Sequence, residues 1–202
     1  MLAIDGPDGS GKSTFADHLA AAFERAGRTA FRASIDGFQR PREERYRVGR
    51  LSPEGYYRDA FDYSLFRRVL IEPFRLGGST GFVLEAFDLE RDAPIEPKWI
   101  TGPADAVLIL DGVFLNRREL KGLWHYSVWV DAEPEVRAAR LQERDGIEPG
   151  SELAERYEGG QRLYVRDAAP NAAASAIVDN TDADAPKRRY ADYCTVPPAP
   201  MR

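Results

Sequence analysis

The stretch GPDGSGKST, residues 6–14, decides how this sequence folds. It fits the pattern G-x-x-x-x-G-K-[ST] of the phosphate-binding loop, whose glycines let backbone N–H groups turn inward around a phosphate. The apolar stretch LAID precedes it at 2–5, and an amphipathic helix is expected at 12–26, with Gly27 just past its end. Because strand, glycine-rich turn and helix stand in this order, we predict a nucleoside triphosphate site rather than a chance turn.

The loop gives each of its residues a task. The helix beginning near Lys12 directs its positive dipole end at the bound anion. Lys12 is expected to bridge the β- and γ-phosphates, and the Ser13 hydroxyl to ligate Mg²⁺. The predicted nucleotide-binding residues of the loop are Gly6, Pro7, Asp8, Gly9, Ser10, Gly11, Lys12, Ser13 and Thr14.

A second acid for the metal is expected at the end of a neighbouring strand. The run AVLIL at 106–110 is continuously apolar, as in a central parallel strand, and it leads directly into Asp111 and Gly112. A carboxylate there can hold Mg²⁺ through the water shell that this ion retains. The alternative is an ordinary Asp-Gly turn. We predict Ser13 and Asp111 as the metal residues, Mg²⁺ as cofactor and ATP as phosphoryl donor.

Around the loop, patterns typical of strands alternate with patterns typical of helices. The expected strands are 2–5, 29–34, 106–110, 125–130 and 175–178, and the expected helices are 12–26, 63–74, 134–146 and 151–166. This alternation predicts the α/β class: a P-loop NTPase three-layer α/β/α sandwich with a mainly parallel sheet, a lid helix and a small acceptor-side hairpin.

One domain over 1–185 fits the chain length of 202 residues, followed by a loosely held C-terminal tail at 186–202. Within the domain, the lid is expected at about 134–165 and an acceptor-side segment at about 37–97. That segment is expected to be irregular from 37 to 60, with a helix that Pro73 ends and a hairpin within 79–97.

The composition argues against several partners. A net charge of −5 is unfavourable for a broad basic face that neutralises duplex nucleic acid. A single cysteine, Cys194, allows no internal disulfide and fits a reducing compartment. No apolar stretch approaches the ~18 residues that span a membrane. We predict a cytoplasmic protein with no nucleic-acid or membrane partner, which forms a homo-oligomer or acts as a monomer.

The remaining motifs favour a small-molecule kinase. The chain has no N-K-x-D guanine signature and is short for a motor ATPase. SIDGF (34–38), DAFD (59–62), the strand ending at Asp111 and the arginine-bearing helix 134–145 follow the loop in order. This order resembles the uridine kinase family, in the wider group that contains phosphoribulokinase, pantothenate kinase and nicotinamide riboside kinase. The resemblance covers about residues 1–180.

The resemblance assigns a catalytic base. In uridine kinases an S-x-D-x-F-Y stretch follows the second strand, and its aspartate accepts the proton of the acceptor hydroxyl. Ser34, Asp36 and Phe38 match this stretch. From local sequence alone, Asp36 before Gly37 reads equally as a turn residue. Phosphoryl transfer needs a carboxylate that orients the attacking hydroxyl and receives its proton.

The helix EPEVRAARLQERD (133–145) places Arg137, Arg140 and Arg144 on one face. The resemblance implies a lid whose arginines neutralise the transferred phosphoryl group: Arg140 and Arg144 in catalysis, with Lys12, and Arg137 in nucleotide binding. The alternative is a solvated face paired with neighbouring acids, Glu133, Glu143 and Asp145.

Three departures from the family concern the acceptor. Gln39 stands where the family has tyrosine, GYYR replaces the F-D-H-P that precedes DAFD, and no histidine lies near 84–91 to read a pyrimidine. The Mg²⁺ acid is aspartate where uridine kinases commonly have glutamate. Either Tyr56 or Tyr57 takes the place of the family's ribose-binding aspartate. The acceptor-binding candidates are Phe38, Tyr57, Asp59 and Arg91.

The acceptor itself stays open. The leading expectation is a nucleoside similar to uridine or cytidine, or a similar small metabolite. The stretch RPREERYRVGR (40–50) holds five arginines, which form either a solvated loop or a grip for an anionic acceptor such as a sugar phosphate or pantothenate-like acid. The alternative from another class is a nucleotide-sensing module without catalysis.

Overall fold

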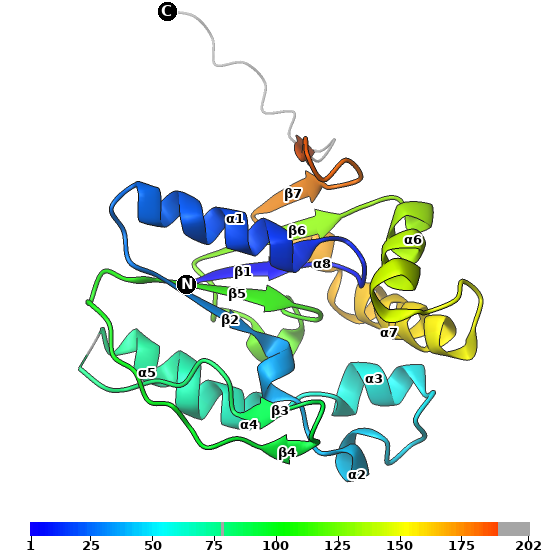
Figure 1. The fold of residues 1–202 in the computed structure, drawn as a ribbon, viewed down its shortest axis with the longest axis horizontal. Helices are drawn as coiled ribbons and strands as arrows, with labels where there is room; N and C mark the ends of the chain where they lie inside the picture. Colours follow the sequence, from blue (N-terminus) through cyan, green and yellow to red (C-terminus); the bar gives the residue numbers. More distant parts are fainter. Residues whose placement is uncertain (78, 190–202) are drawn as a thin grey trace, which may run out of the picture.

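The protein is described by a computed structural model over residues 1–77 and 79–189. Its centre is a six-stranded sheet in the order β2-β5-β1-β6-β7-β8 (Figure 1). The first five in this order are parallel, and β8 runs antiparallel to β7. The strands are β1 (Leu2–Asp5), β2 (Ala30–Ser34), β5 (Val107–Gly112), β6 (Tyr126–Asp131), β7 (Ala176–Asp179) and β8 (Lys187–Arg189).

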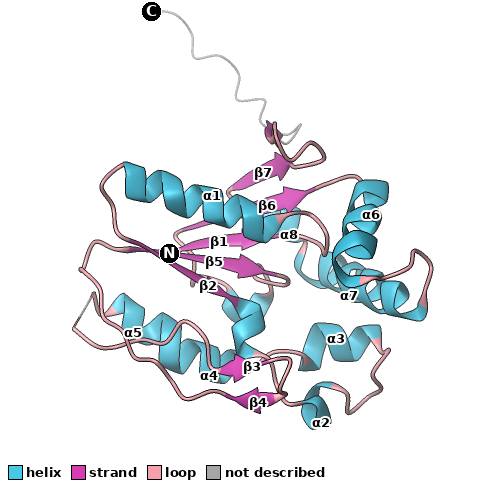
Figure 2. Cartoon of the chain, viewed as in Figure 1, coloured by secondary structure: helices cyan, strands magenta, loops and turns pink. Residues whose placement is uncertain are grey.

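Helices cover both faces of this sheet (Figure 2). On one face, α1 (Lys12–Arg25) buries Ala16 and Ala20 against Ile4 and Ile109 of the central strands. The larger core lies on the other face, where the aromatic rings of α3, α4 and α7 pack together. The arrangement is a three-layer α/β/α sandwich with a mainly parallel sheet, which confirms the fold expected from the sequence.

The remaining elements lie in the connections between these strands. They are η1 (Ile35–Phe38), α2 (Arg42–Arg45), α3 (Pro53–Asp59), α4 (Tyr63–Phe66), η2 (Arg67–Ile71), α5 (Glu72–Arg75), η3 (Arg118–Leu120), α6 (Pro134–Asp145), α7 (Glu152–Ala168) and α8 (Pro170–Ala173). The expected hairpin within 79–97 forms as β3 (Phe87–Asp88) paired with β4 (Ala93–Pro94).

Two local predictions in the acceptor-side segment were wrong. Residues 37–60 contain α3, which Ser52 caps by accepting a hydrogen bond from the Gly55 N–H at 3.1 Å, with Pro53 in the first turn. The helix from Tyr63 does not end at Pro73 but continues to Arg75. A π-helical stretch, η2, precedes Pro73 and changes the register of backbone bonding, so that proline again occupies a first-turn position.

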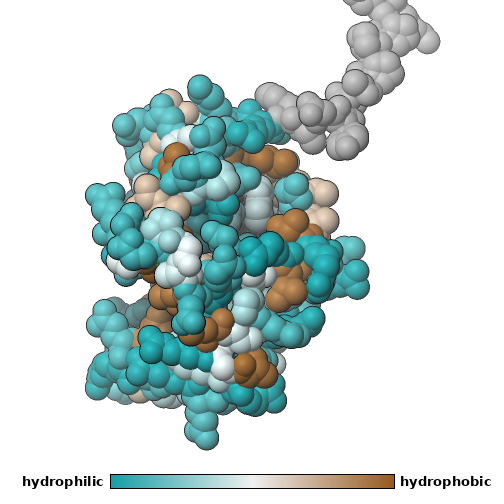
Figure 3. Space-filling model, turned by 90° about the vertical axis from the view of Figure 1, so that its right-hand side faces the viewer, coloured by the Kyte–Doolittle hydropathy of each residue, from teal (hydrophilic) through white to brown (hydrophobic). Residues whose placement is uncertain are grey.

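The sheet also extends slightly further than expected. β8 pairs Lys187–Arg189 with β7, four residues beyond the predicted end of the domain at 185, and the Arg189 guanidinium bonds the Asp179 carboxylate. The rest of the predicted tail, 190–202, lies outside the described residues. Among the described helices, none combines the length and apolar character needed to cross a membrane. The face in Figure 3 is mainly hydrophilic, with small separate hydrophobic patches.

Candidate active site

The phosphate-binding loop connects β1 to α1 with left-handed or otherwise special backbone at its glycines. Gly6, Gly9 and Gly11 have φ of 153°, 75° and 85°. A Cβ at Gly6 would lie 2.0 Å from the carbonyl oxygen of Val130, and one at Gly9 would lie 2.5 Å from that of Arg137. The loop therefore sits tightly between β6 and α6, and its shape depends on the absence of side chains.

Polar groups inside the loop are arranged for an anion. Lys12 is 9% exposed, and its ammonium donates to the Pro7 carbonyl at 2.7 Å, so the side chain folds back across the loop. α1 begins after Gly11 with no side-chain cap, which leaves its first N–H groups free to bind a phosphate. The buried Ser10 hydroxyl has no hydrogen-bond partner among the described residues, whereas Thr14 is exposed.

The two predicted metal residues come together. The Ser13 hydroxyl donates to Asp111 Oδ2 at 2.6 Å, although the residues are 98 positions apart. Asp111 is the penultimate residue of β5, directly after the predicted apolar run, and its other oxygen accepts a hydrogen bond from Arg32 at 2.9 Å. A hydroxyl and a carboxylate beside a phosphate loop are the oxygen donors that Mg²⁺ prefers. These residues fit the ion.

Asp36 lies in η1 directly after β2. Its backbone N–H donates to Ser34 Oγ, and Gln39 Nε2 donates to its carboxylate at 3.2 Å. Gln39, a departure from the family, thus positions the candidate base. Solvent reaches the carboxylate through a pocket, but desolvation by the pocket walls raises its pKa; the Gln39 hydrogen bond lowers it, and the nearby Asp8 charge raises it again.

This pocket has a volume of about 320 Å³, and we call it the Asp36 pocket. It is walled by the phosphate loop, η1, α2, α3, α6 and α7. Its polar and aromatic lining residues are Asp8, Asp36, Gln39, Arg45, Tyr46, Tyr56, Arg144, Asp145, Arg156 and Tyr157. The volume falls within the range of small-molecule sites.

Asp8 joins the phosphate loop to the walls of this pocket. The Tyr56 hydroxyl lies 3.0 Å from both oxygens of the Asp8 carboxylate, and Gln161 Nε2 lies 3.4 Å from one of them. Burial and the Asp8 charge raise the pKa of Tyr56 well above its usual value, so its hydroxyl remains a donor. Hydrogen bonds from α3 and α7 thereby join both helices to the phosphate-binding loop.

The three arginines of α6 take different positions. Arg137 stands over Gly9 and donates to the Ala132 carbonyl at 3.1 Å. Arg140 donates to the carbonyls of Asn180 and Thr181 at 3.0 and 3.1 Å, and approaches the Gly9 carbonyl at 3.4 Å. Arg144 pairs with Asp145 and lines the Asp36 pocket. Only Asp145, of the acids proposed as partners for a solvated face, pairs with a predicted lid arginine among the described residues.

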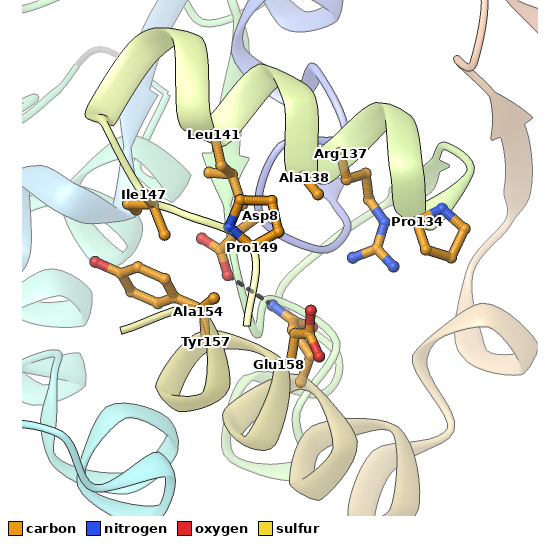
Figure 4. A pocket seen from close by; sticks show the side chains of 11 residues that line it. Asp8, Pro134, Arg137, Ala138, Leu141, Ile147, Pro149, Ala154, Tyr157 and Glu158 are labelled. Carbon is orange, nitrogen blue, oxygen red and sulfur yellow. Dashed lines mark hydrogen bonds between the residues drawn. The ribbon is translucent and has the colours of Figure 1, made fainter. Parts of the chain in front are cut away.

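A second, smaller cavity of about 40 Å³ separates α6 from α7. Figure 4 shows it below Leu141 and Ala138 of α6 and above Ala154 and Glu158 of α7, with Asp8 at its back. At ~10–15 Å³ for each water it holds a few waters and no nucleotide base. The two helices therefore face each other across this cavity.

The four predicted acceptor residues lie away from the Asp36 pocket. Phe38 is fully buried and packs edge-on against Phe66. Tyr57 faces the core beside Phe114, Asp59 pairs with Arg47 at 3.5 Å, and Arg91 is exposed in the β3–β4 turn. None of these four lines the pocket, where Tyr56 stands instead.

The arginine-rich stretch 40–50 is largely paired with nearby acids. Arg40 pairs with Glu44, Arg42 and Arg45 approach Asp92, and Arg47 pairs with Asp59. Arg45, 2.9 Å from Asp92, is the one arginine of this group that lines the Asp36 pocket in the described chain. Sequence reasoning missed Arg156, Tyr157 and Gln161 of α7, which carry no local motif.

Comparisons with known proteins show what the chain as a whole is similar to. No family model matches the chain. It is 27% identical to a uridine kinase of Leuconostoc citreum over 151 residues, 74% of this chain and 70% of that protein, and 27% identical to a uridine kinase of Halobacterium salinarum over 158 residues, 75% and 65% respectively.

Solved structures of kinases superimpose on most of this chain. A possible uridine kinase from Bacillus stearothermophilus superimposes with a TM-score of 0.66 at 20% identity, over 87% of this chain and 86% of that one. A putative fructose transport system kinase from Silicibacter superimposes with a TM-score of 0.59 at 28% identity, over 86% and 84%.

This chain resembles the uridine kinases and has the fold of the P-loop kinase superfamily. The likeness supports a kinase phosphotransferase that uses ATP as donor and a small molecule as acceptor.

Proposed function

We propose that this protein transfers the γ-phosphoryl group of ATP to a hydroxyl of a nucleoside or a similar small metabolite, with Asp36 as the general base. The observation that carries the proposal is the Asp36 pocket, in which a carboxylate faces the same space as Asp8 of the phosphate loop and Arg144 of α6. A base, a donor loop and a cation thus share one pocket of suitable size.

The donor is held by the loop and by its flanking groups. Backbone N–H groups of 6–11 and the start of α1 bind the β-phosphate, and Lys12, released from Pro7, bridges the β- and γ-phosphates. Ser13 and Asp111 would hold Mg²⁺, partly through its water shell. When bound, this ion neutralises charge on the phosphate oxygens.

In the proposed reaction, each bond formed is matched by a bond broken, and Asp36 receives the proton that is released. The acceptor oxygen forms a bond to the γ-phosphorus while the bond from that phosphorus to the β–γ bridging oxygen breaks, and ADP leaves. The proton of the acceptor hydroxyl passes to the Asp36 carboxylate. Gln39 holds that carboxylate in place, and its raised pKa makes it a stronger base than an exposed aspartate. Arg144 supplies positive charge from the wall of the pocket.

The acceptor candidates come from two similarities. The two uridine kinases, each 27% identical to this chain, favour a nucleoside acceptor. The absence of a histidine in the hairpin and the similarity to a putative fructose transport system kinase favour a sugar-like polyol. Both acceptors offer a primary hydroxyl to Asp36. The proposed mechanism is the same for both.

The test combines an acceptor screen with one variant. Mg·ATP and purified protein meet nucleosides and sugars, with ADP release and product mass recorded. Asp36→Asn should retain ADP binding and lose roughly 10²-fold or more in turnover. Asp105→Asn is the matched control, because Asp105 pairs with Arg28 at the opposite ends of the strands. Near-normal turnover in Asp36→Asn would disprove the base, and ADP release that no acceptor stimulates would favour a nucleotide-sensing module.

A further inference from the structure

Arg156 on α7 is a buried arginine without a carboxylate partner. Only 7% of the residue is exposed, and its side chain makes no hydrogen bond or ion pair within the described residues; its buried Nε has no partner either. Arginine stays protonated in proteins, and buried charges are nearly always paired. The side chain nevertheless reaches the Asp36 pocket as one of its lining residues.

Three tyrosine rings hold this guanidinium. Its central carbon lies 4.6 Å from the ring centroid of Tyr56, 5.2 Å from that of Tyr157 and 5.7 Å from that of Tyr46. Aromatic faces attract a cation without neutralising it. The cage therefore fixes the guanidinium and leaves its charge and its N–H donors available.

The fold builds the cage through close packing of α3 on α7. A Cβ at Gly160 would lie 2.6 Å from the Tyr56 ring, and one at Gly159 would lie 2.7 Å from Pro53. These two glycines let the helices approach until Tyr56 stacks on Arg156. The same ring directs its hydroxyl at Asp8, so the cage is coupled to the phosphate loop.

The other cations of the pocket are already paired. Arg45 lies 2.9 Å from Asp92 and donates to the Arg40 carbonyl, and Arg144 pairs with Asp145. Of the carboxylates, Asp36 accepts from Gln39, and Asp8 accepts from Tyr56. Among the described residues that line the pocket, Arg156 is thus the cation without a carboxylate partner.

We propose that Arg156 binds an oxyanion of the acceptor, a carboxylate or a phosphate, while Asp36 receives the proton of its hydroxyl. This rests on the proposed kinase function and narrows it to acceptors that carry a negative group. The guanidinium fork suits both oxyanions, because each offers two oxygens to parallel N–H donors. The arginine-rich stretch 40–50, paired as it is, then serves the structure of the pocket rather than the charge of the substrate.

The test compares neutral polyols with related acceptors that carry a carboxylate or a phosphate: glycerol with glycerate and glycerol 3-phosphate, and glucose with gluconate and glucose 6-phosphate. Uridine is a further neutral acceptor. Wild-type protein should phosphorylate a charged member in preference to its neutral counterpart. Whether the carboxylate or the phosphate acceptor of a set is phosphorylated shows which of the two oxyanions Arg156 binds.

Variants then locate the effect. Arg156→Gln should lower kcat/KM for the charged acceptor by about 30-fold or more, chiefly through KM, and leave KM for ATP unchanged. Arg156→Lys should recover part of the loss, because it restores the charge without the fork. Arg166→Gln, on the exposed part of the same helix and paired with Asp167, is the control for a change on α7 and should match the wild type.

Three results would overturn the subsite. Wild-type preference for neutral acceptors would exclude it, as would an equal loss for neutral and charged acceptors in both Arg156 variants, which marks a purely structural role. If no acceptor is phosphorylated while ADP still binds, the kinase function itself is wrong and the subsite with it. The first two results leave the kinase function intact.

Discussion

The two sides of the Asp36 pocket are built in different ways. On the donor side, one continuous stretch, 6–14, makes the site from backbone N–H groups and a helix start. On the acceptor side, side chains converge from η1, α2, α3, α6 and α7. The backbone of the donor side tolerates almost no added atoms, whereas the acceptor side is defined by which side chains meet there.

With the proposed function, this difference lets the fold keep one reaction while the acceptor changes. Substitutions in α3 or α7 alter the pocket lining without moving the phosphate loop, except where Tyr56 and Gln161 bond Asp8. The Asp8 contacts are the link between the two sides. Variants of the donor backbone, the metal residues, this link and the base can each break or sharpen the contrast.

Gly9→Ala should have the largest effect. The residue has φ +75°, and its new Cβ would meet the Arg137 carbonyl oxygen at 2.5 Å, so the loop must leave its position beneath α6. Gly27→Ala is the matched control, with the same φ of +75° and no atom within 4 Å. We expect Gly9→Ala to lose ADP binding by 10²-fold or more, roughly the cost of a displaced phosphate cradle.

The control should lose only about 1 kcal/mol of stability, the usual penalty for a left-handed non-glycine residue, and keep its ADP affinity. Calorimetric ADP titrations and thermal melts of both variants give the comparison. Equal ADP affinities in the two variants would show that ADP binding does not depend on the backbone conformation of the phosphate loop.

Asp111→Asn comes next. Its amide keeps one oxygen toward Ser13 but removes the charge that attracts Mg²⁺, and it leaves Arg32 with Asp17 as its remaining carboxylate. We expect the Mg²⁺ concentration for half-maximal activity to rise about 10- to 100-fold, typical for a group that acts through the metal's water shell. Mg²⁺ titrations at fixed ATP measure this. An unchanged Mg²⁺ requirement would contradict the metal role of Asp111 and favour its alternative role as a turn residue.

Tyr56→Phe should have an intermediate effect, because it breaks the link between the two sides. Its lost hydroxyl leaves Asp8 with the longer Gln161 contact, and hydrogen bonds to charged groups are worth enough for about a 10-fold loss in kcat/KM. Tyr57→Phe is the neighbouring control, since that side chain faces the core beside Phe114. A larger loss in Tyr57→Phe than in Tyr56→Phe would favour the acceptor residue expected from the sequence.

That choice between two tyrosines shows where sequence reasoning ended. The position of the phosphate loop between β1 and α1 and that of Asp111 near Ser13 follow from local signals, a motif and an apolar run that leads into a carboxylate. Tyr56 and Tyr57 point about 100° apart on a helix, so which of them lines the pocket follows only once α3 is known to be helical. With 37–60 taken as irregular, no periodicity could separate them.

Arg156 was beyond local reasoning for a related physical reason. Its role depends on α3 packing against α7 through Gly159 and Gly160, contacts between segments about a hundred residues apart. In the sequence it is one more arginine on a charged helix face. Only the tertiary structure shows that Arg45 and Arg144 have acids to pair with and that Arg156, among the described residues, does not.

The smallest effect concerns the stability cost of the base. Desolvation raises the pKa of Asp36 in the folded state, so the folded protein binds the proton more tightly than the unfolded chain. The contribution of Asp36 to the free energy of unfolding is therefore full below the ordinary aspartate pKa of about 4 and is lost as the pH rises through the raised pKa of the folded state.

The amide introduced by Asp36→Asn stays neutral at every pH in this range. The variant should thus match the wild type near pH 4 and be slightly more stable at pH 7, despite its lower turnover. Urea melts across this range measure the difference, and a variant that loses stability at pH 7 would mark Asp36 as a structural turn residue rather than a base kept at the expense of stability.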